Sequence, residues 1–205
     1  MSRGATARLF VAIDPPLQAR EQLAEWARGA VAGAREPGAT RGGLRALSAQ
    51  SLHLTLCFLG ARPVGEIEAL AAAVGGCVEQ ACELAVGAPL WLPPRRPRAL
   101  AVEIHDLAGE LAGVHARVSA AIGQASGWEP ERRRFRPHIT LVRAGRSALG
   151  ARGSRSGRTR SERPLPATPR IAFTPAAIVL YRSWLAPEGA SYEQIASCEL
   201  APLAR

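Results

Sequence analysis

Residues 52–60 read LHLTLCFLG and residues 135–143 read FRPHITLVR, so the pattern His-x-Thr-Leu occurs twice in this chain. Each copy lies within an apolar stretch that is typical of a β-strand. Alternate side chains of a strand point to opposite faces. The apolar residues of each copy are therefore expected to face a core, while the imidazole and the hydroxyl share the other face.

The duplication supplies two imidazoles, His53 and His138, and two hydroxyls, Thr55 and Thr140. Cleavage of a phosphodiester needs such a pair, because one histidine takes a proton while the other gives one. A single copy would be interpreted as ordinary strand sequence, since threonine favours strands and a buried histidine is often a satisfied core residue. Threonine fills only 7 of the 205 positions, which makes a matched pair by chance uncommon. We therefore interpret the pair as a candidate acid–base site.

Length and composition predict a soluble globular protein. The chain has 205 residues, 47% of them hydrophobic, which is enough to bury a substantial core. No apolar run reaches the length of about 18 residues that a membrane-spanning helix needs. The N-terminus leads into a strand-like segment without the pattern of a signal peptide. We expect a cytoplasmic protein, a monomer, with no membrane association.

The cysteines and the remaining histidines give no sign of a metal site or a disulfide framework. The four cysteines include no Cys-x-x-Cys pair and are expected to be buried and reduced. His105 and His115 have no metal-ligand spacing to each other or to a cysteine. We therefore expect no metal and no cofactor.

Positive charge is concentrated around the second motif. All 26 basic residues are arginines, and the formal net charge is +9. Residues 132–170 hold 12 of these arginines and one acid, whereas the rest of the chain holds 14 arginines and 16 acids. Local positive potential favours an anionic substrate, although an arginine-rich proteome with a solvated loop is an alternative. We expect residues 132–143 to be functional and residues 144–169, rich in Arg, Gly and Ser, to form a flexible loop.

Sequence patterns predict strands that alternate with three helices. The strands are expected at 8–13, 44–47, 52–59, 83–87, 99–104, 138–143, 170–181 with a break at Pro175, and 192–200, and the helices at 17–34, 64–82 and 107–126. Each half of the chain contributes one motif. We therefore expect one α+β domain, residues 1–205, made of two pseudo-symmetric lobes. Each lobe is an antiparallel sheet with helices on its outer face, and a central cleft carries both motifs.

Five segments in order resemble the 2H phosphoesterase superfamily, specifically the RNA 2′,3′-cyclic phosphodiesterases, also called 2′-5′ RNA ligases. These segments are residues 8–13, 52–60, 94–98, 135–143 and 179–183, so the resemblance extends over nearly the whole chain. The chain departs from the family at Ala46, where an aromatic residue is common, and at Cys57, where a basic residue is common. Its 144–169 loop is also longer. None of these departures affects the His or Thr positions.

The resemblance implies metal-independent hydrolysis of a 2′,3′-cyclic phosphate at an RNA end to a 2′-phosphate, for example on a tRNA fragment. It implies His138 as the base and His53 as the acid, in an assignment that could be exchanged. Thr55 and Thr140 would then donate hydrogen bonds to the non-bridging phosphate oxygens. The reverse reaction, a 2′-5′ ligation to a 5′-hydroxyl, is chemically permitted because it uses the same groups.

Three further residues are candidate substrate contacts. Arg143 lies five residues after His138, so a bulge or a strand end is needed to turn its side chain toward the phosphate. Phe10 is a candidate for stacking on the terminal base, with a core phenylalanine as the alternative. Arg136 is a candidate contact to the RNA backbone, with a solvated surface charge as the alternative.

Two other functions stay open at this point. A non-catalytic RNA-binding module would use the arginine-rich segment and leave the motif pair without a chemical role. A phosphodiesterase of the same fold would act instead on a 2′-5′ oligonucleotide or on another nucleotide-derived phosphodiester. Substitution of both histidines tests the first alternative, and a comparison of substrates tests the second.

Overall fold

The computed structural model describes residues 5–33, 44–77, 79–94, 97–131, 133–144, 165–186 and 189–202. Its elements are β1 (Thr6–Ile13), α1 (Leu17–Gly33), β2 (Leu44–Ala46), β3 (Leu54–Pro63), α2 (Ile67–Gly75), β4 (Leu84–Leu92), β5 (Ala99–Asp106), α3 (Leu111–Ser126), β6 (His138–Ala144), β7 (Ala172–Phe173), β8 (Ala177–Ala186) and β9 (Gly189–Glu199). Among the helices described, none is long and apolar enough to cross a membrane.

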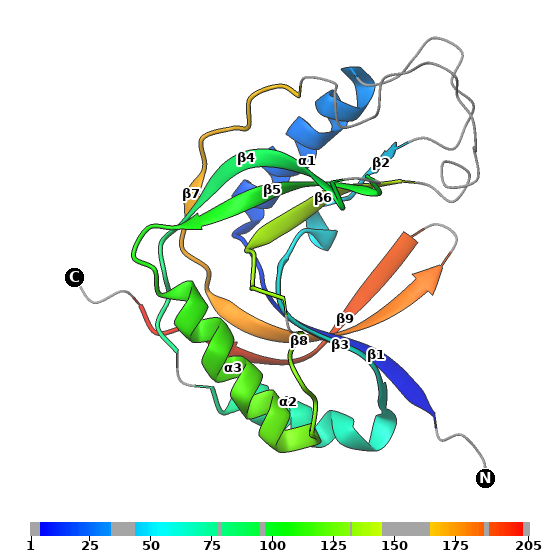
Figure 1. Ribbon diagram of the computed structural model, residues 1–205, viewed down its shortest axis with the longest axis vertical. Coiled ribbons are helices and arrows are strands. Elements are labelled where there is room, and N and C mark those ends of the chain that lie inside the picture. Colours follow the sequence, from blue (N-terminus) through cyan, green and yellow to red (C-terminus); the bar gives the residue numbers. More distant parts are fainter. Residues whose placement is uncertain are drawn as a thin grey trace.

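The strands form one curled sheet in two halves (Figure 1). The sheet has nine strands in the order β7-β4-β5-β6-β3-β1-β8-β9, with β2 paired to β6, and every strand pair is antiparallel. The halves join at β3 and β6, where a single residue pair, Leu54 opposite Ile139, connects the two motif strands. The two motifs therefore meet at the boundary between the halves.

Helices cover the outer face of each half, and the inner faces are turned toward each other (Figure 1). α1 packs against β2 and β6, while α2 and α3 pack together against β3, β8 and β9. Two of the helices cross to the other half. α1 follows β1 but packs on the half that contains β6, and α3 follows β5 but packs on the half that contains β3. The expected α+β fold of two lobes is confirmed, and the exchanged helices connect the lobes.

One continuous hydrophobic core lies beneath both halves. The alternation predicted for the motif strands is present, since the apolar residues of both motifs are at most 5% exposed: Leu54, Leu56, Ile139 and Leu141. Burial of these four side chains leaves the histidines and threonines on the opposite, inner face. We term this the motif face.

The second helix is shorter than the sequence pattern predicted. The helix was expected over 64–82, but residues 64–66 form a 3-10 turn and α2 ends at Gly75. Two consecutive glycines, Gly75 and Gly76, explain this end, because glycine loses more backbone entropy in a helix than any other residue.

The third helix begins at Leu111 rather than at 107. The carboxylate of Asp106 accepts hydrogen bonds from the backbone N–H groups of Ala108 at 3.3 Å, Gly109 at 3.0 Å and Leu111 at 2.6 Å. The bond from Leu111 satisfies a donor that the helix leaves unpaired at its first turn, and the other two pair N–H groups in the turn before it. The side chain therefore fixes a turn before the helix starts.

β4 is longer than the strand expected at 83–87, since it continues through Pro89 to Leu92. Proline cannot donate to a strand ladder. Here it lies at a register shift, where the pairing of β4 with β5 is interrupted between Val86 and Pro89, and such irregularities tolerate proline. The break expected at Pro175 is confirmed, because it separates β7 from β8.

Most of the expected loop at 144–169 falls outside the described residues, because 145–164 are not among them. Its last part, 165–169, has no regular secondary structure, and hydrogen bonds attach it to α1 on one side and to β4 on the other. Trp26 Nε1 donates to Ala167 O at 2.8 Å, and Thr168 Oγ1 donates to Gly87 O at 2.8 Å. The segment that leads into β7 is thus attached to α1 and β4.

Candidate active site

The join between β3 and β6 places the four motif side chains beside one another. Leu54 and Ile139 are the pair that joins the strands, and extending their antiparallel register by one residue in each direction brings His53 opposite Thr140 and Thr55 opposite His138. Side chains that are opposite across such a pair have Cβ atoms about 5 Å apart, and diagonal neighbours are about 7–8 Å apart. All four side chains are partly exposed. The motif face therefore carries two imidazoles and two hydroxyls in one compact group.

Each imidazole is held by a backbone carbonyl two residues earlier in the chain. His53 Nδ1 lies 3.0 Å from Ser51 O, and His138 Nδ1 lies 2.7 Å from Arg136 O. A carbonyl oxygen only accepts, so in each neutral ring Nδ1 carries the proton and donates. Nε2 is then unprotonated, and it is the atom through which each histidine exchanges protons.

The surroundings of His53 lower its pKa to about 4. Burial is the main cause, because it disfavours the charged ring, and the positive charges of Arg143 and His138 act in the same direction. The hydrogen bond to the Ser51 carbonyl opposes these effects. At neutral pH the His53 ring is therefore neutral, able to accept a proton and not to give one.

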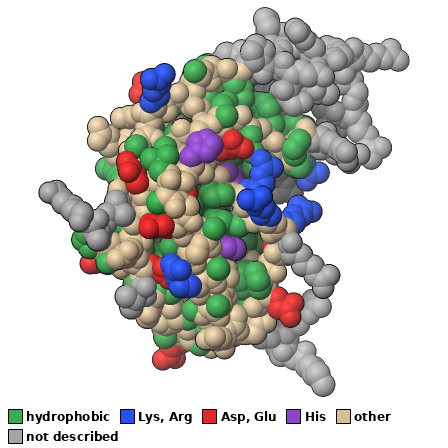
Figure 2. Space-filling view, turned by 60° about the vertical axis from the view of Figure 1, so that its left-hand side comes forward, with side chains coloured by type: hydrophobic (Ala, Val, Ile, Leu, Met, Phe, Trp, Pro, Cys, Tyr) green, Lys and Arg blue, Asp and Glu red, His purple; other side chains and the backbone are tan. Residues whose placement is uncertain are grey.

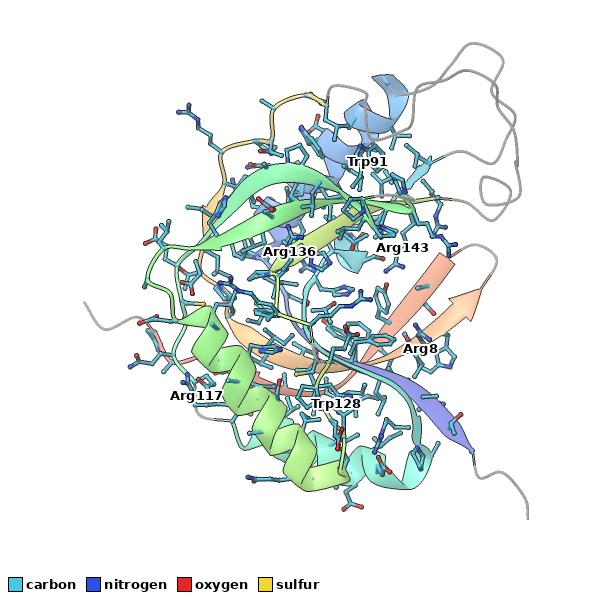
Figure 3. All side chains as sticks on the ribbon, viewed as in Figure 1. Arg8, Trp91, Arg117, Trp128, Arg136 and Arg143 are labelled. Carbon is cyan, nitrogen blue, oxygen red and sulfur yellow. The ribbon has the colours of Figure 1, made fainter. Side chains whose placement is uncertain are left out.

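A β-bulge in β6 turns Arg143 to the motif face. Consecutive residues of β5 pair with Thr140 and Val142, so Leu141 is an extra residue in the ladder. Leu141 and Val142 are consequently both buried, and Arg143 is exposed. Figure 3 shows Arg143 near the end of β6, and its charge contributes to the low pKa of His53. The structure thus contains the bulge that this arginine requires to reach the site.

β3 contains an equivalent bulge. Consecutive residues of β1 pair with Cys57 and Thr55, which leaves Leu56 as the extra residue. Leu56 and Cys57 are both buried, and Phe58 is 42% exposed. Phe58 stands five residues after its histidine and is therefore the counterpart of Arg143 in the other half.

The two departures from the family pattern lie away from the motif face. Cys57 is 1% exposed, and its Sγ is 3.3 Å from Ser119 Oγ of α3. Ala46 pairs with Val142, a fully buried residue of β6, and it packs against the core. Both side chains therefore pack into the protein rather than on the motif face.

An aromatic cluster supports His53. The ring centroids of Phe10 and Tyr192 lie 4.7 Å and 5.2 Å from that of His53, and Phe10 is stacked on Tyr181 at 5.2 Å. Phe10 is only 4% exposed. It therefore supports the imidazole and offers no free face to a base. Tyr192, which is partly exposed and which the sequence did not identify, has the more accessible ring.

A polar contact behind this cluster fixes Tyr181. Its hydroxyl donates to Asp14 Oδ2 at 2.6 Å, and Arg20 Nη1 lies 4.0 Å from the same oxygen. Burial raises the pKa of Asp14, while the hydrogen bond and the arginine partly offset this effect. The tyrosine ring is thereby held against Phe10, and through it beneath His53.

Arg136 contributes to the site through its backbone. Its carbonyl accepts the hydrogen bond from His138, while its exposed guanidinium lies 3.3 Å from Glu103 Oε1. Glu103 is directly opposite His138 on β5. The side chain therefore already has a carboxylate partner, which makes it a weaker candidate for binding RNA than Arg143.

Two other observations bear on the chemistry of the site. Among the described residues, no group of three His, Cys, Asp or Glu side chains is arranged to hold a metal ion. A cavity of about 270 Å³ lies elsewhere, between α1 and residues 170–173, and its lining includes Arg170 but no histidine. The motif face is therefore the better candidate for acid–base chemistry.

Several basic side chains form a group on one side of the molecule, while others lie apart from it (Figure 2). In Figure 2 the group lies to the right of centre, beside a histidine, whereas acidic side chains are scattered over the visible face. Such a distribution favours an anionic ligand on that side.

Comparison with known proteins supports the fold and the chemistry. No family model matches the chain. The chain is 32% identical over 150 residues to an RNA 2′,3′-cyclic phosphodiesterase of Escherichia coli strain K12. The matched region covers 69% of this chain and 74% of that protein. Two solved structures, each 24% identical, cover 96% of this chain and 99% of their own: a phosphoesterase, with a TM-score of 0.74, and E. coli LigT complexed with 3′-AMP, with a TM-score of 0.72. These structures share the fold over nearly its whole length.

Proposed function

We propose that this chain, which belongs to the RNA 2′,3′-cyclic phosphodiesterase family of the 2H phosphoesterases, opens the 2′,3′-cyclic phosphate at an RNA end and leaves a 2′-phosphate. The observation that carries the proposal is the meeting of the two motifs across one strand pair, with Nδ1 of each histidine bonded to a backbone carbonyl so that Nε2 is the atom that exchanges protons. Two imidazoles so placed supply both the base and the acid, so the proton transfers need no metal.

The reaction needs one proton accepted and one proton given. Water attacks phosphorus, a P–O bond forms, and the bond from phosphorus to the ribose 3′-oxygen breaks. The sequence-based assignment made His138 the base. The low pKa of His53 favours the reverse assignment, because a neutral ring takes the proton of water. His138, whose hydrogen bond to the backbone is exposed to solvent, then protonates the departing 3′-oxygen.

The phosphate itself is held by neutral and charged donors. Thr55 and Thr140 share the motif face with the histidines, and their hydroxyls would donate to the non-bridging oxygens. Arg143, turned to the same face by the bulge in β6, adds a positive charge where negative charge develops in the transition state. The reverse reaction, ligation to a 5′-hydroxyl, uses the same groups in the opposite order.

The deciding experiment uses a short RNA that ends in a 2′,3′-cyclic phosphate, with EDTA present. We expect conversion to a 2′-phosphate end, and we expect His53→Ala and His138→Ala each to reduce kcat/KM by at least about 100-fold. His105→Ala, which removes an exposed histidine outside both motifs, is the matched control and should retain activity. Absence of turnover by the wild type, or turnover by both motif variants equal to that of the wild type, would contradict the proposal.

The same experiment separates the alternatives. A wild-type protein that binds the RNA without turnover, with binding unchanged in both histidine variants, would be an RNA-binding module. Turnover of a 2′-5′-linked oligonucleotide without turnover of the cyclic end would indicate a related phosphodiesterase. A 3′-sulfur leaving group tests the assignment of roles, because sulfur needs little protonation and should restore activity only to the variant that lacks the acid.

A further inference from the structure

A second arginine stands beside Arg143. Arg45 of β2 lies directly opposite Arg143 of β6, and both side chains are exposed. Residues that are opposite across an antiparallel pair point to the same face, so Arg45 also belongs to the motif face. Like charges in this position destabilise a sheet, and a bound anion between them would remove that cost.

Nothing in the described part of the chain neutralises these two arginines. The salt bridges found there use other arginines, namely Arg20, Arg62, Arg117 and Arg136. The local charge therefore favours an anionic ligand at the pair.

The position of the pair relative to the histidines indicates which anion this is. The bulge in β6 turns Arg143 to the motif face, on the side where the histidines would hold a phosphate, and its charge acts on His53. Arg45 stands beside Arg143 on the neighbouring strand, at a strand spacing of about 4.8 Å, along the same edge of β6 that β3 joins. Its guanidinium matches the geometry of a phosphate, which it can bind through two N–H groups at once.

We propose that Arg45, together with Arg143, binds a second phosphate of the substrate, one nucleotide to the 5′ side of the cyclic phosphate. The enzyme would then act on the ends of RNA chains in preference to a lone nucleoside 2′,3′-cyclic phosphate. This inference rests on the proposed function, and it adds a residue, Arg45, that would recognise the phosphate next to the cyclic end.

The test compares kcat/KM for three substrates. They are a nucleoside 2′,3′-cyclic phosphate, the same nucleoside with an added 5′-phosphate, and a dinucleotide that ends in the same cyclic phosphate. The wild type should prefer both substrates with a second phosphate, and Arg45→Gln should reduce this preference about tenfold. The preference of the wild type should also weaken as salt concentration rises. Arg28→Gln, which removes an exposed arginine from the outer side of α1, should leave the preference unchanged.

Each outcome has a distinct meaning. If the 5′-phosphate and the dinucleotide raise kcat/KM equally, the site recognises a phosphate as such. If only the dinucleotide raises kcat/KM, and Arg45→Gln abolishes this increase, the site recognises the internucleotide phosphate. A preference for the dinucleotide that persists in Arg45→Gln assigns it to the added base and overturns the inference. Failure of the wild type to turn over all three substrates refutes the proposed function instead. Circular dichroism confirms that the variant is folded.

Discussion

At the scale of single residues, the protonation of His53 determines its chemical role. Its pKa of about 4 means that the ring accepts protons above that pH and is already protonated below it. If His53 is the base, kcat/KM should fall on the acid side near pH 4, because this parameter reports the ionisation of the free enzyme.

Arg143→Gln provides the test of this assignment. The substitution removes a positive charge that disfavours the protonated ring, so the pKa of His53 should rise and the acid limb should move to higher pH. An NMR titration of His53 in wild type and variant measures the shift directly. An acid limb that stays in place in Arg143→Gln would show that another group sets it.

Tyr181 is a second residue whose role can be tested. Tyr181→Phe keeps the ring beneath Phe10 but removes the hydroxyl that donates to the half-buried Asp14. We expect a loss of about 1–2 kcal/mol in the free energy of unfolding, measured with urea, because a carboxyl group loses its donor. Tyr192→Phe is the matched control, and its change should stay within about 0.5 kcal/mol. Equal losses in both variants would contradict this role.

The residue scale also shows what a sequence can reveal. The histidines and threonines could be identified because their spacing of two fits a strand and because the pattern occurs twice. Tyr192 and Asp14 could not, since they reach His53 only through contacts between strands that are distant in the chain. Phe10 was predicted as a contact to a base, with a core phenylalanine as the alternative, and its 4% exposure depends on rings contributed by β8 and β9.

At the scale of the elements, the two bulges decide which side chains reach the site. An ideal β6 would turn Arg143 away from the histidines, and the extra residue Leu141 reverses this. Two adjacent apolar residues before an arginine are consistent with a bulge, but they fit equally well a strand that is buried on both faces. The sequence could therefore state the need for a bulge without predicting it.

The ends of the helices allow a matched test of stability. Gly127 follows α3 with a φ of 62°, and its N–H donates to Gly123 O at 2.8 Å. Gly127→Ala should cost about 1 kcal/mol, because a side chain disfavours this left-handed conformation. Gly29 lies inside α1 with open space at its Cβ position, so Gly29→Ala should stabilise the protein by about 0.5–1 kcal/mol. Thermal melts measure both changes, and the same sign in both would contradict the explanation.

At the scale of the whole molecule, the two halves share one core and exchange helices. The alternation of strands and helices predicted two lobes, and this was correct. It did not predict that α1 and α3 would each cover the opposite lobe, because sequence order favours packing of a helix on its own neighbouring strands. Long-range packing, which no local pattern encodes, decides that arrangement.

The shared core predicts that the halves unfold together. Tryptophan fluorescence and far-ultraviolet circular dichroism should give coincident urea transitions, since Trp91 lies in one half and Trp184 in the other. Leu54→Ala, at the fully buried join, should lower the stability by about 2–5 kcal/mol and keep a single transition. Two separated transitions would show that the lobes are independent.

Different residues, Phe58 and Arg143, stand five positions after the two motif histidines, and this difference affects how a substrate can bind. A site with true two-fold symmetry would admit the cyclic phosphate in two orientations, and in one of them the wrong ribose oxygen would face the acid. Phe58 in one half and Arg143 in the other remove this equivalence. The substrate is then bound one way round, and we expect a single regioisomer, with the phosphate retained on one ribose oxygen only.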